Sequence, residues 1–184
     1  MSTPTGDPRS AQTRRRILDA AADEFAERGL AGARVDRIAE RAGANKQRLY
    51  AYFGSKDQLF DQVIEDRIGQ LLDAVPFDAT DLPAYAVRLF DFNRAHPELV
   101  RLLLWHALER PGVLAGLPQT AASNAAKVEA LRSAGVPRPE ALLGQLLALV
   151  QGYSLTVTSG VDAPDVDTVG ADLHRAVALL RAAA

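Results

Sequence analysis

The sequence predicts an all-α protein of about nine helices, with a three-helix head near the N-terminus and a larger helical body after it. Two observations support this fold class. Apolar residues recur at spacings of three and four along most of the 184 residues, which is the period of an α-helix. The alternation of apolar and polar residues that is typical of strands is almost absent. Because 48% of the residues are hydrophobic, the chain can bury a sizeable core.

Three parts are predicted along the chain. A polar arm over residues 1–12 is expected to be flexible, and a helix-turn-helix head follows over residues 13–56. A long helix over residues 55–75 links this head to a body over residues 76–184. The helices are expected at residues 10 or 13 to 28, 35–42, 46–53, 55–75, 82–95, 97–109, 121–134, 139–158 and 164–184.

The helix boundaries follow from local signals. Gly29 ends the first helix, and Gly54 ends the third. Asn45 is a good N-cap for the third helix. Ser55, with a glutamine three residues later, matches a capping box that opens the long linking helix. The glycines and prolines of residues 111–118 predict a loop or a broken helix.

One stretch, residues 141–161, has no charged residue and is long enough to span a bilayer. Six polar side chains and three glycines interrupt it, however. A helix that is apolar nearly all round is more simply buried inside a bundle and across a subunit interface. We therefore expect no membrane span.

The net charge of −2 hides an asymmetry between the head and the rest of the chain. Residues 9–56 carry 11 Lys and Arg against 6 Asp and Glu, and the remainder carries 10 against 17. A basic head on an acidic body is typical of a nucleic-acid binder with a separate second function. Chance segregation of surface charge is the alternative.

The third helix has the division of side chains that a DNA-recognition helix needs. Leu49 and Phe53 lie four residues apart and face inward, while donors gather near the N-terminal end. An ordinary solvated helix face is the alternative interpretation. The side chains left for the other faces are Lys46, Gln47, Arg48, Tyr50 and Tyr52.

Cations near two helix starts also indicate a phosphate partner. Arg14, Arg15 and Arg16 are expected in or near the first turns of the first helix, and Lys56 lies just inside the fourth. A helix N-terminus is positively polarised, so these cations are locally unfavourable. A phosphate bound between the helix start and the cation would reverse the sign.

Residues 14–72 resemble the head of the TetR family of transcription regulators. The matching blocks are Arg15-Arg16-Ile17-Leu18-Asp19-Ala20-Ala21, Val35-Asp36-Arg37-Ile38-Ala39, and the run from Asn45 through Phe53 to Leu59. The resemblance implies a repressor that binds double-stranded operator DNA. The residues implied at the DNA are Arg14, Arg37, Asn45, Lys46, Gln47, Arg48, Tyr50, Tyr52 and Lys56.

The resemblance also implies individual roles. Lys46, Gln47 and Arg48 would face the bases, Tyr50 would pack on the DNA backbone, and Lys56 would hold a phosphate. Arg37 would help at the groove or the backbone. Two positions depart from the family pattern. Ala33-Arg34 stands where a Ser or Thr usually caps the second helix, and Tyr52 replaces a histidine.

The resemblance implies that the last two helices of each subunit form a four-helix homodimer interface. Residues 141–158, with Leu173, Val177 and Leu180, suit that role, and an internal core helix is the alternative. Two heads related by a two-fold axis would read half-sites roughly 34–36 Å apart, which predicts a palindromic operator.

An unknown small-molecule effector is expected in a pocket among the body helices, where its binding would release the DNA. Ordinary core or surface positions are the alternative for each candidate residue. No cofactor is expected, and three scattered histidines do not form a metal-site pattern. The candidate effector-binding residues are Phe92, Asn93, His96, Trp105, His106 and Tyr153.

Two other functions are alternatives. An enzyme is disfavoured, since the chain has no glycine-rich phosphate loop and no His-Glu-x-x-His or Gly-x-Ser-x-Gly motif. A helical adaptor that binds only protein would show no salt-dependent affinity for promoter DNA. The absence of cysteine and of an apolar N-terminal signal fits a cytoplasmic protein.

Overall fold

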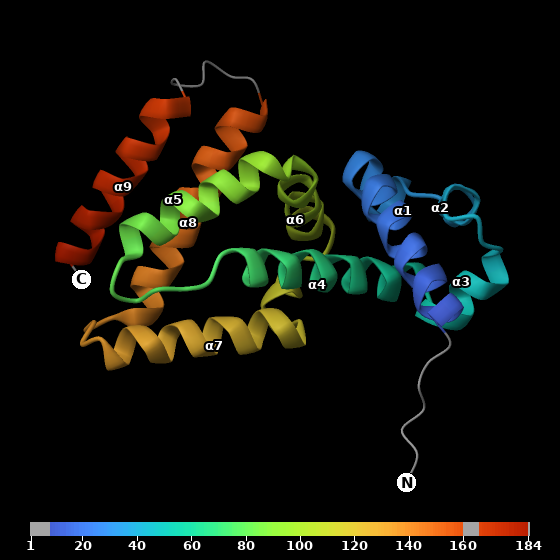
Figure 1. Cartoon of the computed structure of the whole chain (residues 1–184), viewed down its shortest axis with the longest axis horizontal. Coiled ribbons are helices and arrows are strands. Elements are labelled where there is room, and N and C mark those ends of the chain that lie inside the picture. Colours follow the sequence, from blue (N-terminus) through green and yellow to red (C-terminus); the bar gives the residue numbers. More distant parts are fainter. Residues whose placement is uncertain (1–7, 160–165, 184) are drawn as a thin grey trace, which may run out of the picture. The chain divides into compact units, whose positions relative to one another are not determined.

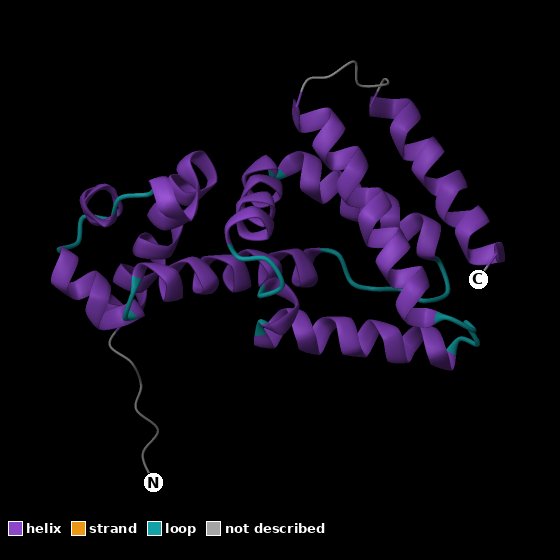
Figure 2. Cartoon of the chain, turned by 180° about the vertical axis from the view of Figure 1, so that it is seen from behind, coloured by secondary structure: helices purple, strands orange, loops and turns teal. Residues whose placement is uncertain are grey.

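The computed structural model describes residues 8–159 and 166–183. Within those residues the chain forms nine α-helices, one short 3-10 helix and no strand, so the predicted all-α class is confirmed (Figure 2). The elements are α1 (Pro8–Gly32), α2 (Val35–Arg41), α3 (Lys46–Phe53), α4 (Lys56–Ala74), α5 (Leu82–Ala95), α6 (Pro97–Glu109), η1 (Leu114–Gly116), α7 (Pro118–Ser133), α8 (Pro139–Ser159) and α9 (Val166–Ala183) (Figure 1).

The helices group into two compact units. The head unit comprises the described residues of Met1–Arg67 together with Arg101–Leu114, and the body unit comprises the described residues of Ile68–Val100 and Ala115–Ala184. Two helices, α4 and α6, each begin in one unit and end in the other. The second half of α6 therefore packs with the head, although it is distant from the head in the sequence.

The first helix differs from the prediction at both ends. It begins at Pro8, so residues 8–12 are helical rather than part of a flexible arm; residues 1–7 lie outside the described residues. Pro suits this position because the first turn of a helix has no partner for a backbone N–H. At the other end, Gly29 does not end α1 but kinks it, with φ 68° and ψ −179°, and one more turn follows to Gly32.

Most of the other predicted boundaries are close to the observed ones. The backbone N–H of Gln58 donates to Ser55 Oγ at 3.1 Å, which confirms the predicted cap of α4. Pro118 begins α7 three residues earlier than expected, after the 3-10 turn η1. The predicted start of the last helix, residues 164 and 165, and its end at residue 184 lie outside the described residues.

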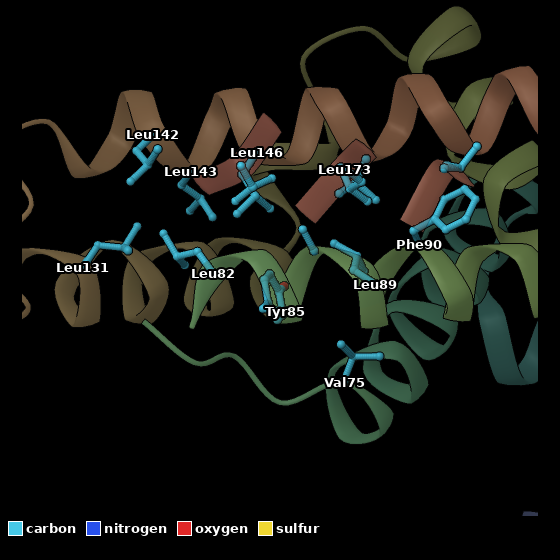
Figure 3. Packing of buried hydrophobic residues seen from close by; sticks show 14 residues of the cluster. Val75, Leu82, Tyr85, Leu89, Phe90, Leu131, Leu142, Leu143, Leu146 and Leu173 are labelled. Atoms are coloured by element: carbon cyan, nitrogen blue, oxygen red, sulfur yellow. The ribbon is translucent and has the colours of Figure 1, made fainter. Parts of the chain in front are cut away.

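The core of the body unit lies between α5, α8 and α9. Side chains of α5 and α8 face each other across it, with Leu82 and Phe90 on one side and Leu142 and Leu146 on the other (Figure 3). Leu173 and Val177, which were expected at a subunit interface, are fully buried in this same core. Other residues lie on the outer face of α9, among them Leu179, which is 67% exposed.

Helix α8 is buried on one side only. Leu143, Leu146 and Val150 face the core, whereas Gly144, Ala148 and Gly152 are exposed. In the described part of the chain, no helix has the length and apolar character needed to cross a membrane.

Candidate nucleic-acid interface

Of the three N-terminal helices of the head, α2 and α3 are too short to be stable alone in water. They are stabilised by burying apolar side chains against one another. Ile17 and Phe25 of α1, Ile38 of α2, and Leu49 and Phe53 of α3 are each at most 2% exposed. Leu49 and Phe53, the inward positions predicted for the third helix, therefore belong to the core of the head.

The helix-turn-helix joint depends on a glycine and a cap. Gly43 has φ 58°, a conformation that disfavours residues with a side chain, and it follows the last turn of α2. The backbone N–H of Ala44 donates to Ala39 O at 2.9 Å, which closes that turn. At the start of α3 the backbone N–H of Arg48 donates to Asn45 Oδ1 at 2.7 Å, so the predicted N-cap is confirmed.

Helix α2 lacks a side-chain cap of its own, and a residue of α1 replaces it. The residue before α2, Arg34, makes no side-chain capping bond. Instead its backbone N–H donates to Oε1 of Glu24 at 3.0 Å. This carboxylate therefore accepts the backbone N–H of the cap residue itself, the bond that the Glu or Gln of a capping box makes from within its own helix.

Glu24 is fully buried and is held ionised by its partners. Its Oε1 accepts a hydrogen bond from Arg37 Nε at 2.8 Å as well as the one from the Arg34 backbone. Burial opposes ionisation, but these hydrogen bonds and the charge of Arg37 together lower the pKa of Glu24 below its ordinary value. Arg37, assigned to the DNA from the sequence, thus joins α1 to α2 in this structure.

The front of α3 is polar and free of carboxylates. Gln47 and Arg48 are exposed near the N-terminal end of the helix, and Lys46 is half-exposed beside them. Lys46 Nζ lies 3.0 Å from Asp36 Oδ1 of α2, and the hydrogen bond and charge of Asp36 raise the pKa of the lysine. This front presents donors to solvent while Leu49 and Phe53 anchor its back.

A small polar pocket of about 280 Å³ joins α3 to the first turns of α1. The hydroxyl of Tyr52 lies 2.9 Å from Ser10 Oγ at one wall. Arg48 and Arg9 supply two guanidinium groups to the same pocket. Arg9 and Ser10 were missed from the sequence because residues 1–12 were interpreted as an arm.

The remaining predicted DNA residues surround this surface. Lys56 donates from Nζ to the carbonyl of Ala33 at 3.3 Å, at the start of α2. Tyr50 is 39% exposed. The guanidinium of Arg14 lies 5.3 Å from the centre of the Phe53 ring and also donates to Gln62.

The three arginines Arg14 to Arg16 do not lie at the start of the first helix, as the sequence had suggested. Because α1 begins at Pro8, Arg14 to Arg16 lie in its second and third turns, beyond the reach of the N-terminal dipole. Arg15 forms ion pairs with Asp19 and Asp66, each at 3.0 Å. Lys56, in contrast, is the first residue of α4, as predicted.

The residues predicted to bind an effector are not brought together. Trp105 and His106 belong to the head unit, where Trp105 Nε1 donates to Ala26 O at 3.3 Å. His106 is fully buried, stacks on Phe60, and has Nε2 3.7 Å from Asp61 Oδ1. Burial lowers the pKa of His106 more than the charge of Asp61 raises it.

The other four candidates lie in the body unit. Asn93 is buried and donates from Nδ2 to Ser154 Oγ at 3.1 Å, which ties α5 to α8. The rings of Phe92 and His96 are 4.2 Å apart at the end of α5. Tyr153 lines a separate recess on the outer side of α8. Among the described residues, no three His, Asp or Glu are grouped so that they could hold a metal ion.

Comparison with known families matches two parts of the chain. Residues 17–63 match the description "Bacterial regulatory proteins, tetR family". Residues 81–184 match the description "Tetracyclin repressor-like, C-terminal domain". The two matches include all of α3 and most of the body unit.

Individual relatives agree with these matches. The chain is 41% identical over 156 residues to the HTH-type transcriptional repressor SCO4008 of Streptomyces coelicolor, a match that covers 79% of each protein. It is 35% identical over 99 residues to the repressor NicS of Pseudomonas putida, covering 50% of the chain and 47% of NicS. The crystal structure of the transcriptional regulator SCO4942 of S. coelicolor is similar at 35% identity and a TM-score of 0.76, covering 90% of this chain and 96% of the other.

Proposed function

Since the chain belongs to the TetR family of helix-turn-helix regulatory proteins, we propose that it is a transcriptional repressor that binds a palindromic operator as a homodimer and is released by a small-molecule effector. One observation supports the DNA-binding part above the others. The N-terminal half of α3 exposes Lys46, Gln47 and Arg48 while Leu49 and Phe53 bury its back. A recognition helix requires this division. The proposal assigns no catalytic activity and places the protein in the cytoplasm with its DNA.

The proposed roles follow the chemistry of each side chain. Lys46, Gln47 and Arg48 would donate to base edges in the major groove. Lys56 and the N-terminus of α4 would share one phosphate, which both attract. The remaining residues would fix the register of the head on the duplex. They are Arg14, Tyr50 and Tyr52 at the backbone, Asn45 as the cap of α3, and Arg37 as a positioning residue through Glu24.

A homodimer is supported by the outer faces of α8 and α9. Gly144, Ala148 and Gly152 form a stripe of small residues on the exposed side of α8, along which another helix could approach closely. An apolar recess of about 410 Å³ continues this face onto α9, where Leu179 is exposed. A second copy of the chain would cover both features.

Release by an effector is proposed to act through the two helices that belong to both units. A ligand that favours one arrangement of the body would bias α4 and α6, and with them the head. The ligand must bind the two arrangements with different affinity for operator binding to change.

DNA titration tests the proposal. The full chain is titrated by fluorescence anisotropy against fragments upstream of its own gene and of the neighbouring genes, over a range of salt. We expect tight, salt-dependent binding to at least one fragment, as a dimer by native mass measurement. Lys56→Ala should weaken binding to all fragments and reduce the salt slope by about one. Gln47→Ala should relax preference at one base pair, at a cost of about 1–3 kcal/mol.

Two results would overturn it. A folded protein that binds none of these duplexes at low salt would remove the DNA-binding function. A monomer bound to a single half-site would remove the dimer and, with it, the palindromic operator.

A further inference from the structure

The body unit contains an open pocket of about 400 Å³ along α7 that none of the predicted effector residues line. We refer to it as the α7 pocket. Its volume lies in the range of small-molecule sites, which runs from about 300 to 1,000 Å³. The lining residues are Leu72, Val75, Phe77, Gln119, Ala122, Ser123, Ala126 and Lys127.

The sequence of α7 explains why this space is hollow. Ala122, Ser123 and Ala126 recur at spacings of three and four, so this helix face carries only short side chains between Gln119 and Lys127. Larger apolar side chains, those of Leu72 and Phe77, line the pocket with them but leave it unfilled. The pocket therefore has mostly carbon walls.

Both ends of α7 are fixed, which keeps the pocket open. At one end Leu131 is fully buried in the core of the body unit. At the other end α4 and Gln119 approach closely. A Cβ atom on Gly69 would lie 2.9 Å from Nε2 of Gln119. Because each end has its own packing, the short residues between them cannot collapse onto the opposite wall.

The two polar side chains at the limits of the pocket differ in charge. Gln119 and Lys127 are eight residues apart, which corresponds to about 12 Å along a helix. Gln119 offers a neutral amide, and Lys127 offers an ammonium. In the part of the chain that the structure describes, no other charged side chain lines the pocket.

Lys127 is a half-buried cation without a carboxylate. None of the ion pairs between described residues includes it, and burial lowers its pKa. Glu129, two residues along the same helix, binds Arg132. Its Nζ lies 5.9 Å from the centre of the Tyr85 ring, near the outer limit of a cation–π contact. That contact holds the ammonium at the apolar wall but leaves its charge unpaired.

We propose that the α7 pocket is the effector site and that it takes an apolar monoanion, a carboxylate with an aliphatic or aromatic body up to about 12 Å long. The carboxylate binds Lys127 and the body lies on the carbon walls toward Gln119. The regulatory role of the ligand rests on the proposed function, whereas the ligand class follows from the pocket.

Matched probes test the ligand class on the full chain without DNA. Decanoate is compared with 1-decanol and decyltrimethylammonium, and 1-naphthaleneacetate with 2-(1-naphthyl)ethanol, by calorimetry below micelle-forming concentrations. We expect each anion to bind about tenfold more tightly than its alcohol, because a hydrogen bond to a charged group is stronger by roughly 1.4 kcal/mol. The cation should bind more weakly than both decyl partners.

Three variants locate the site. Lys127→Met should remove the preference for the anion over the alcohol, and Lys127→Arg should keep it. Ala126→Phe should abolish binding of every probe because the ring fills the pocket. Arg94→Met is the matched control, since Arg94 is an exposed cation of α5 outside the pocket. Circular dichroism checks that each variant is folded.

The outcomes separate this proposal from the proposed function. The proposal is overturned if neither anion outbinds its alcohol, if the cation binds best, or if Lys127→Met or Ala126→Phe behaves as the wild type. Operator titration with and without decanoate is then read separately. Anion binding that leaves operator affinity unchanged would contradict release while leaving the ligand class intact.

Discussion

Arg37 Nε lies 2.8 Å from Oε1 of Glu24, so a partly exposed cation of α2 meets a carboxylate of α1 that has no exposed surface. The same oxygen accepts the first free backbone N–H of α2, from Arg34. The second carboxylate oxygen has no hydrogen-bond partner among the described residues, although Arg41 lies at 4.0 Å. One side chain therefore caps α2 and pairs its arginine.

Replacing Glu24 should destabilise the head. Glu24→Ala removes both hydrogen bonds and leaves Arg37 and the Arg34 N–H without their acceptor, which we expect to cost about 2–3 kcal/mol. Glu24→Gln keeps an acceptor of the same shape and should cost about half as much. Urea unfolding measures both. An alanine variant within about 0.5 kcal/mol of the wild type would show that the cap has no energetic role.

Removing the carboxylate of Asp36 should strengthen DNA binding. Asp36→Asn frees Lys46 and removes a negative charge beside the proposed groove-facing residues, so we expect about three- to tenfold tighter operator binding at low salt. Stability should change by less than about 0.5 kcal/mol because the pair is exposed. Asp23→Asn, an exposed position of α1, is the control for net charge. Equal effects of the two substitutions would argue against a specific role for Asp36.

Gly29 should not accept a side chain. Its φ of 68° with ψ of −179° is a region that only glycine occupies readily, and a Cβ would lie 2.5 Å from Glu109 Oε1 and 2.8 Å from the Trp105 ring. We expect Gly29→Ala to cost about 3 kcal/mol in urea unfolding. Gly32→Ala is the matched control, since its Cβ would meet only Arg28 at 3.4 Å. It should be neutral or slightly stabilising, and similar losses for both variants would contradict the argument.

His106 should make the stability of the head depend on pH. Burial lowers the pKa of His106 in the folded state below the ordinary 6.5. The nearby Asp61 raises this pKa, and Arg110 lowers it, so the net shift is downward. Between the folded pKa and pH about 6.5, His106 binds a proton in the unfolded chain but not in the folded chain. Stability should therefore fall as the pH drops from 6.5 to the folded pKa, by up to about 1.4 kcal/mol per pH unit.

His106→Leu should remove this part of the pH dependence. Urea midpoints of both proteins at several pH values between 7.5 and 5 isolate the contribution of the histidine, since other titrating groups are shared. Parallel curves for the two proteins would mean that His106 titrates alike in the folded and unfolded chains.

A charge at position 179 should separate the proposed dimer. Leu179 lies on the apolar outer face of α9 and is 67% exposed, so Leu179→Glu should place a carboxylate inside the interface and shift the protein to monomer in native mass measurement. Leu108→Glu is the matched control, because Leu108 is 73% exposed on α6 in the head unit. A dimer that survives Leu179→Glu would move the interface elsewhere.

Local signals predicted the local parts of this molecule well. The cap at Asn45 and the cap at Ser55 are each decided by residues within four positions, and both are observed. The start of α1 was missed because polar composition suggested an arm, although Pro8 is a good first residue of a helix.

Contacts between distant parts of the chain could not be predicted. The chemistry of Trp105 and His106 suggested an effector pocket, but both residues pack in the head unit. Trp105 bonds to Ala26, which is 79 residues away in the sequence. The requirement for glycine at position 29 also depends on distant residues, since Trp105 and Glu109 occupy the space that a side chain would need. The capping role of Glu24 was likewise invisible, because no residue near Arg34 indicates it.

The borrowed cap has a consequence for how the head acquires its structure. An excised peptide of residues 33–54 would contain both helices of the motif but not the acceptor at position 24, so it should remain mostly disordered until α1 is supplied. A Ser or Thr introduced at 34 would accept a later N–H of the first turn of α2, so it would not replace the carboxylate of Glu24, which accepts the N–H of residue 34 itself.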